Sequence, residues 1–191
     1  MKPLPRKSHM YWRRLDGSGR EEARIEQTAE GWRLAGRLEA EEASVRAQLM
    51  YVIDCELSWR TRRAIITGSA SGANVRFEFT ADGEGHWMLN GAPLPLVQGA
   101  LDIDLGFTPA TNLLPIRRLN LKVGERARVR TAWLRFPELR VDELEQWYQR
   151  EAARVFHYEA LVDGERFQAR LDTDEFGRVL FYEGLWEVEI P

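Results

Sequence analysis

The sequence has few residues of the kinds that form cross-links or metal centres. It contains one cysteine and three histidines in 191 residues. The single Cys55 excludes an intramolecular disulfide and any metal site built from several cysteines. It falls on the apolar side of an alternating segment, so we expect a buried, inert thiol. His9, His86 and His157 are scattered and match no metal-binding motif. We therefore expect no metal and no cofactor, in a chain long enough to fold around its own apolar core.

The sequence also lacks long apolar runs, excess positive charge and known catalytic motifs. Without a run of about 18 apolar residues, no helix is expected to cross a membrane. Lys and Arg number 27 against 30 Asp and Glu, so the net charge of −3 argues against nucleic-acid binding. The first residues hold neither a signal-peptide core nor a lipidation cysteine, which predicts a cytoplasmic location. No nucleophile elbow, Walker loop, zinc-protease motif or dinucleotide fingerprint occurs.

What the sequence does contain is the alternation of apolar and polar residues that is typical of β-strands. Residues 45–56 are the longest example, and residues 75–79 and 166–171 follow the same pattern. Asn90-Gly91 and Asp163-Gly164 are typical of tight hairpin turns, which join antiparallel neighbours. About twelve strands in one sheet would curl to protect their edges. We predict a mainly β fold, with a single strongly curved antiparallel sheet forming an incomplete or spiral β-barrel and few short helices.

The chain shows no repeat, low-complexity tract or long linker. Residues 1–191 are therefore expected to form one domain, with residues 1–10 loosely held. Residues 141–148 have apolar side chains at helical spacing, with Asp142 as a candidate cap, but they fit a strand equally well. Residues 110–119 are expected to form a short helical turn.

The segment 99–121 is the strongest candidate for a functional site. Asp102 and Asp104 alternate with apolar residues on a predicted strand, which places both carboxylates on one face, about 6.5 Å apart. Like charges at this spacing need cations, hydrogen-bond donors or water nearby. Thr108 and Asn112 follow in a loop bounded by prolines and offer further polar contacts. The simplest alternative is that the acids face solvent, the loop side chains cap a turn and nearby arginines pair with the acids.

Arginine and tryptophan side chains form a second set of candidate contacts. Trp59 lies beside Arg60 and Arg62, Arg117 follows the acidic segment, and Trp133 ends a later strand. Guanidinium groups bind anions in a planar geometry, and an indole ring stacks on sugar rings. Most of the seven tryptophans are nevertheless expected in the core.

Several motifs occur together in this chain. They are Tyr51-Val52-Ile53-Asp54, Trp59-Arg60-Thr61-Arg62, the block from Asp102 to Asn112, Leu114 to Leu119, Trp133 to Pro137 and Gly184-Leu185-Trp186. Over nearly the whole chain after about residue 10, this combination resembles the bacterial putative glycolipid-binding family. The resemblance implies a spiral, incompletely closed β-barrel, similar in fold to periplasmic lipoprotein carriers. It also implies a glycolipid or another amphipathic small molecule as the ligand.

Three functions are open at this stage, and the sequence favours the first, a binding protein rather than an enzyme. In it, Asp102, Asp104, Thr108 and Asn112 bond to ligand hydroxyls, and the three arginines named above hold an anionic group or orient the carboxylates. Trp59 or Trp133 stacks on the ligand.

The second function is a sugar-processing enzyme that uses Asp102 and Asp104 as a carboxylate pair. The third is purely structural, with the two acids locked to Arg60, Arg62 or Arg117 as a latch. An exposed sheet edge would also suit a homodimer.

Overall fold

A computed structural model describes residues 7–189, and most of this part of the chain is β-strand. One sheet contains its fifteen strands. In chain order they are β1 (Lys7–Arg14), β2 (Gly19–Gln27), β3 (Gly31–Glu42), β4 (Val45–Glu56), β5 (Thr61–Ala70), β6 (Ala73–Ala81), β7 (Trp87–Leu89), β8 (Ala92–Pro93), β9 (Asp102–Leu105), β10 (Arg126–Leu134), β11 (Val141–Ala152), β12 (Val155–Val162), β13 (Glu165–Thr173), β14 (Val179–Tyr182) and β15 (Trp186–Val188). The helical segments are the 3-10 turns η1 (Pro95–Val97) and η2 (Ala110–Asn112) and the helix α1 (Leu113–Leu119).

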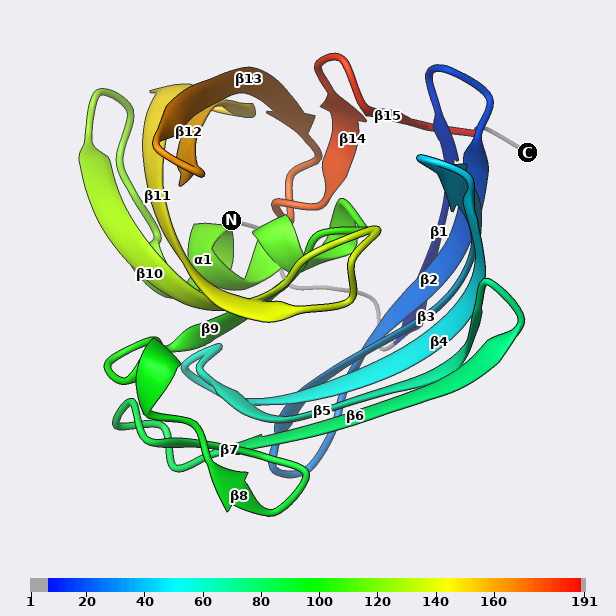
Figure 1. The fold of residues 1–191 in the computed structure, drawn as a ribbon. Coiled ribbons are helices and arrows are strands. Elements are labelled where there is room, and N and C mark those ends of the chain that lie inside the picture. Colours follow the sequence, from blue (N-terminus) through cyan, green and yellow to red (C-terminus); the bar gives the residue numbers. More distant parts are fainter. Residues whose placement is uncertain (1–6, 190–191) are drawn as a thin grey trace.

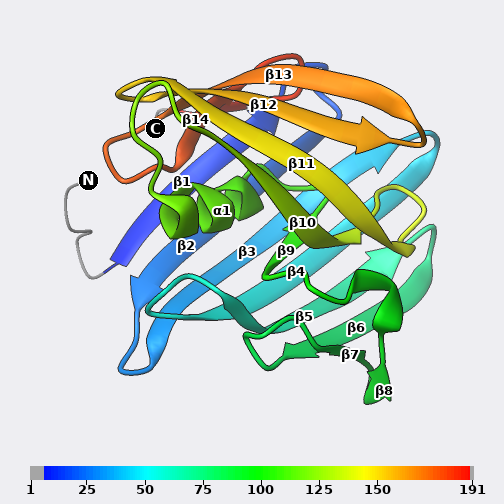
Figure 2. The ribbon, with the colours of Figure 1, turned by 90° about the vertical axis from the view of Figure 1, so that its left-hand side faces the viewer.

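The sheet winds as a spiral and does not close into a barrel. Its strand order is β8-β7-β6-β5-β4-β3-β2-β1-β15-β14-β13-β12-β11-β10-β9, so β8 and β9 form the two edges. The first and last strands pair in the middle of this order, with Trp12 opposite Val188. Figure 1 shows β1–β6 as one curved wall and β10–β14 as a second curl, with α1 between them, and Figure 2 shows the same two layers from the side. We call these two parts the wall and the curl.

The β9 edge of the sheet returns to the wall. The backbone N–H of Thr61 donates to the Leu101 carbonyl at 3.0 Å, and the Thr61 hydroxyl accepts from the N–H of Ile103 at 3.1 Å. β9 runs parallel to β10, whereas the other strand pairs in residues 7–189 are antiparallel. A parallel pair needs a crossover connection, and the segment with η2 and α1 supplies it.

Strand alternation gives the wall an apolar inner face. On β4, Leu49, Tyr51 and Ile53 are at most 1% exposed, whereas Met50 between them is 54% exposed. Tyr51 pairs with Gly36 on β3, and its ring lies over the glycine. A Cβ atom at Gly36 would lie 2.5 Å from that ring, so the close contact requires glycine.

The segment between β9 and β10 fills the space between the wall and the curl. We call residues 106–119 the plug. Leu113, Leu114 and Ile116 on α1 are all buried. The helix ends at Leu119, and the C-cap residue Asn120 has a left-handed φ of 46°, a common way to terminate a helix. The interior is therefore packed around the plug and is not an open barrel.

The predicted spiral sheet with few short helices is confirmed. The helical alternative for residues 141–148 is wrong, because β10 and β12 flank this segment as β11 and complete its hydrogen-bond ladder. The helical turn expected at 110–119 is present as η2 and α1. The expectation of antiparallel neighbours fails at β9–β10. Of the residues expected to be loosely held, 1–6 lie outside the described part and 7–10 belong to β1.

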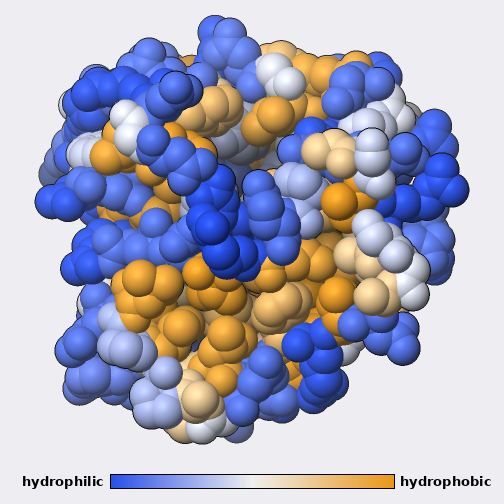
Figure 3. Space-filling model, in the orientation of Figure 1, coloured by the Kyte–Doolittle hydropathy of each residue, from blue (hydrophilic) through white to orange (hydrophobic). Residues whose placement is uncertain are grey.

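The surface combines hydrophobic and charged areas. Figure 3 shows a hollow within the region that the curl encloses in Figure 1, bordered by hydrophobic residues. A hydrophilic ridge separates this hollow from a hydrophobic area between β11 and the wall strands β4–β6. Among the partly buried apolar side chains of the wall are Val75 and Phe77 on β6. In residues 7–189, no helix combines the length and the apolar character needed to span a bilayer.

Candidate functional site

Asp102 and Asp104 project from the same face of β9, as the alternation predicts. In the parallel pair with β10, Asp102 lies opposite Thr131 and Asp104 opposite Trp133. Neighbouring residues in register share a face of the sheet. Both acids therefore belong to the inner face, which meets the plug and the curl.

Arg118 on α1 holds Asp102. Its Nε lies 3.0 and 3.1 Å from the two carboxylate oxygens, and its Nη2 lies 2.5 Å from Oδ2. The Asp102 side chain is 0% exposed. Burial raises the pKa of Asp102, and the hydrogen bonds and positive charge of Arg118 oppose that rise. The pair connects β9 to the plug and leaves Asp102 no accessible oxygen.

Asp104 has a different environment, although it is only two residues away. Its side chain is partly exposed, Gln146 donates to Oδ2, and the Thr111 hydroxyl donates to Oδ1 at 3.4 Å. Burial raises the pKa of Asp104 to about 6, and the charge of Asp102 adds to the rise. Within residues 7–189, no arginine, lysine or histidine forms an ion pair with Asp104. Near neutral pH this carboxylate is therefore mostly ionised and not neutralised.

Gln146 leaves an acceptor without a partner. The residue is 1% exposed, and its Nε2 donates to Asp104. Its Oε1 is buried, with no hydrogen-bond partner among the described residues. The opposite amide orientation would place this oxygen against the carboxylate, so the contact with Asp104 fixes which atom is left over. A buried acceptor without a donor costs free energy that a bound donor would recover.

Three tyrosines form a floor next to Asp104. Tyr148 and Tyr158 have ring centroids 5.1 Å apart, and Tyr158 lies 5.8 Å from Tyr182. Burial raises the pKa of each phenol, and the charge of Asp104 contributes in all three cases. The Tyr148 hydroxyl donates to Asn112 Oδ1 at 2.8 Å and ties this floor to the plug. The carboxylate thus lies beside an aromatic part of the curl.

Trp133 lies beside Asp104 and is partly exposed. A Cβ at Gly106 would come within 2.9 Å of the indole Nε1, so the absence of a side chain there leaves room for the ring. The guanidinium of Arg135 lies 4.7 Å from the centre of the ring and binds Asp163 at 2.7 and 2.6 Å. We call Asp104, Gln146 and Trp133 the Asp104 site. Its three side chains lie on the face that β9 shares with β10 and β11.

A second buried carboxyl lies on the other side of the plug. Glu21 on β2 is 3% exposed, and its Oε1 accepts from the Thr108 hydroxyl at 2.7 Å and from the Tyr51 hydroxyl at 2.5 Å. Its Oε2 is buried and has no partner in the described structure. Burial raises the pKa of Glu21 to about 7, although both hydroxyl bonds act in the opposite direction. Thr108 therefore joins the plug to the wall.

The remaining predicted contacts do not gather at Asp104. Trp59 is 5% exposed and stacks on Trp32 with a centroid distance of 4.5 Å. The Arg117 guanidinium lies 5.3 Å from the Trp59 ring and 4.1 Å from that of Phe176. These rings form an aromatic cluster around Arg117 of the plug.

Two further arginines and Asn112 are also occupied elsewhere. Arg60 donates to the Gly83 carbonyl at 2.9 Å, and Arg62 contacts Glu56 and the Asp82 carbonyl. Asn112 is 8% exposed and donates to the Pro109 carbonyl at 3.1 Å. Of the nine residues named from the sequence, the structure therefore brings Asp104 and Trp133 together at a partly exposed place.

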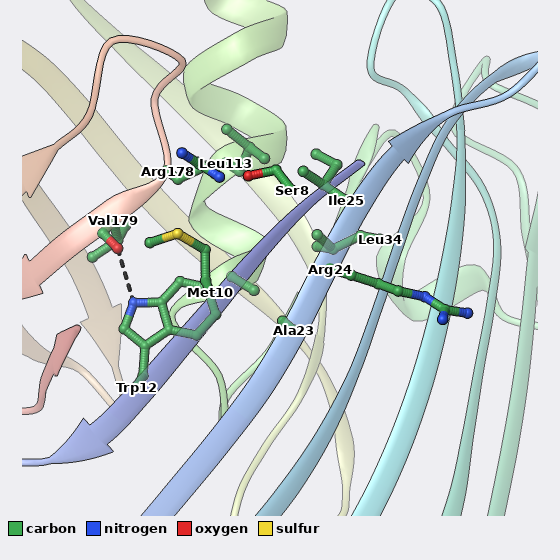
Figure 4. Close-up of a pocket in the computed structure, with 11 residues that line it drawn as sticks. Ser8, Met10, Trp12, Ala23, Arg24, Ile25, Leu34, Leu113, Arg178 and Val179 are labelled. Carbon is green, nitrogen blue, oxygen red and sulfur yellow. Dashed lines mark hydrogen bonds between the residues drawn. The ribbon is translucent and has the colours of Figure 1, made fainter. Parts of the chain in front are cut away.

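Figure 4 shows a small apolar pocket between β1, β2 and α1. Met10, Ile25, Leu34 and Leu113 are among its lining residues, and its free volume is about 10 Å³. The Trp12 indole donates to the Val179 carbonyl at 2.8 Å beside it. This space holds about one water-sized sphere, which is too little for a ligand head group. Within the described residues, no group of three or more His, Cys, Asp or Glu could hold a metal ion.

Sequence reasoning missed Glu21, Gln146 and the tyrosine floor. A signal for Glu21 was available, because it shares the strand face of Ala23 and Ile25, where a charge is unexpected. Gln146 likewise shares the face of Leu144 and Tyr148, but that face is defined only when the segment is known to be a strand.

Comparison with known proteins gives one family and one solved structure. A family model described as putative glycolipid-binding matches residues 9–188. The crystal structure of a DUF1089 family protein from Pseudomonas aeruginosa has a similar fold, with a TM-score of 0.73 and 30% sequence identity. The match covers 98% of this chain and 94% of that one. No protein of curated function matches significantly.

Proposed function

The chain belongs to the putative glycolipid-binding family, and from this premise we propose that it binds an amphipathic, sugar-bearing lipid whose head group occupies the Asp104 site. The observation that carries the proposal is the pairing of Asp104 with Trp133 on one face of the curl. Both side chains are partly exposed, whereas most of the surrounding polar residues are buried and occupied.

This pair matches the chemistry of a sugar. The carboxylate of Asp104 accepts hydrogen bonds from hydroxyl groups, and the indole of Trp133 offers an apolar plate for the C–H face of a sugar ring. Gln146 Oε1 supplies a second acceptor for a ligand donor. Arg135 holds Trp133 in place by stacking on it, while Asp163 fixes Arg135. The site is thus preorganised before a ligand arrives.

Apolar side chains of the curl would contact the lipid chain. Phe167 and Val162 are partly buried on the inner face, next to the fully buried Ala160 and Tyr158. Figure 3 shows hydrophobic residues around the rim of the hollow. A few convergent polar groups within an apolar lining are typical of small-molecule sites.

Binding explains this geometry better than chemistry by a carboxylate pair. Arg118 engages both oxygens of Asp102, so that residue offers neither a free base nor an accessible acid. The structure favours a division of roles, in which Asp102 anchors the plug and Asp104 meets the ligand.

The test is a calorimetric titration of the protein with octyl β-glucoside below its micelle concentration. We expect saturable binding that weakens roughly tenfold in Trp133→Leu, a loss of about 1.4 kcal/mol. The matched control is Trp147→Leu, because Trp147 lies opposite Arg128 on the other face of β11. The affinity of Trp147→Leu for octyl β-glucoside should equal that of the wild type. Absence of binding, or equal affinities for both variants, would overturn the proposal.

A further inference from the structure

The charges around the Asp104 site are unbalanced. The inference drawn from this imbalance concerns the ligand of the proposed function and rests on that function. On the inner face of β9, Asp102 is neutralised by Arg118. Arg135, which stacks on Trp133, is neutralised by Asp163 and Asp142. Among the described residues, Asp104 has no such partner.

The hydrogen-bonding groups of the site also lack partners, because acceptors outnumber donors. Asp104 already accepts from Gln146 and Thr111, and a carboxylate has further lone pairs for ligand donors. Gln146 Oε1 is a buried acceptor with no donor in the described structure. The site thus has acceptor atoms without donors, one of them buried, and the group that matches them is a donor with several N–H bonds.

The aromatic surroundings favour the same ligand. Trp133 is partly exposed beside Asp104, and indole is the aromatic side chain that interacts best with cations through its ring face. Arg135 already stacks on one side of this ring, so a ligand cation would contact the ring from another side. The tyrosine floor limits water around the carboxylate and so strengthens its attraction for a positive charge.

We infer that the head group bound at the Asp104 site carries a protonated amine, as in an amino sugar, held between the Asp104 carboxylate and Gln146 Oε1. A neutral sugar would satisfy the hydrogen bonds but leave the carboxylate charge uncompensated. An anionic head group would be repelled by Asp104. The ligand class is therefore a lipid with an amino-sugar head group rather than a phosphorylated or acidic one.

Three probes with the same alkyl chain test this inference by calorimetry at pH 7. They are octyl β-glucoside, its 2-amino-2-deoxy analogue and the N-acetylated form of that analogue. An amine with a pKa of about 8 is protonated at this pH. We expect the amino analogue to bind about tenfold more tightly than the other two, since charge-assisted hydrogen bonds are roughly twice as strong as neutral ones.

Asp104→Asn should abolish the preference for the amino analogue, so that the three probes bind this variant with affinities within a few-fold of one another. Glu145→Gln is the matched control, since it removes the same charge from the outer face of β11, where Glu145 pairs with Arg128. It should preserve the preference. If the three probes bind the wild type equally, the inference is overturned and the proposed function stands. The same conclusion follows if the preference for the amino analogue survives in Asp104→Asn. If no probe binds, both fail.

Discussion

Arg118 binds both carboxylate oxygens of Asp102, with Nε at 3.0 and 3.1 Å, and this contact joins the plug to β9, an edge strand of the sheet. The Asp102 side chain is 0% exposed and that of Arg118 is 17% exposed. A buried ion pair of this kind contributes little compared with an apolar pair, but losing one partner leaves a charge without compensation. The stability of the plug therefore depends on keeping both residues.

Replacing Arg118 with methionine should be strongly destabilising. We expect Arg118→Met to lower the free energy of unfolding by about 3–5 kcal/mol near pH 7, measured by urea denaturation with tryptophan fluorescence. The loss should shrink at low pH, where protonation neutralises Asp102. Arg128→Met is the control, because the Arg128 side chain is 60% exposed in its pair with Glu145. It should cost at most about 1 kcal/mol, and equal losses in both variants would contradict the account.

Glu21 should make stability depend on pH. Burial raises its pKa to about 7 in the folded protein, against 4.5 for a glutamate side chain in water, so the folded state retains a proton that the unfolded state releases. This contribution is fully present below pH 4.5 and is lost as the pH rises through about 7. It amounts to a few kcal/mol, on the order of 1.4 kcal/mol for each unit of pKa difference.

Glu21→Gln should reduce the slope in urea denaturation series between pH 4.5 and 8, and the slope that remains below about pH 6 belongs to Asp104, whose pKa is also raised. The hydroxyls of Tyr51 and Thr108 can still donate to the amide oxygen. Glu22→Gln serves as the control, because Glu22 is exposed on the opposite face of β2. An unchanged slope in Glu21→Gln would show that another group carries the pH dependence.

Gly36 and Tyr51 should show strong coupling in a double-mutant cycle. A Cβ at Gly36 would lie 2.5 Å from the Tyr51 ring, so Gly36→Ala must displace the ring and should cost about 1–3 kcal/mol. In a Tyr51→Ala background the ring is absent, and adding Gly36→Ala should cost far less. Thermal denaturation of the four proteins measures the coupling, and additive losses would contradict the contact.

Much of the fold could be predicted from the sequence, because strand alternation and hairpin turns are local signals. The shared face of Asp102 and Asp104 follows from the same local rule. The partner of Asp102 could not be predicted, since Arg117 and Arg118 are adjacent and differ by about 100° around a helix whose phase the sequence does not define. Arg117 instead contacts the rings of Trp59 and Phe176.

The polar partner of Asp104 could not be predicted from the sequence either, for a related reason. Gln146 is 42 positions away from Asp104, and its contact depends on the register of β9, β10 and β11. The parallel β9–β10 pair, which brings Trp133 beside Asp104, arises from a crossover through the plug. Such long-range pairing has no signature in local periodicity.

An amphiphile that binds beside Trp133 in the curl should perturb the indole of this residue. The most direct measurement is an ¹H–¹⁵N spectrum of the tryptophan indole groups during titration with octyl β-glucoside below its micelle concentration, with Trp133 assigned through Trp133→Phe. We expect the Nε1–H signal of Trp133 to shift most and to saturate. If the largest shifts belong instead to Trp32 or Trp59, or if no indole signal moves, the Asp104 site is not where the ligand binds.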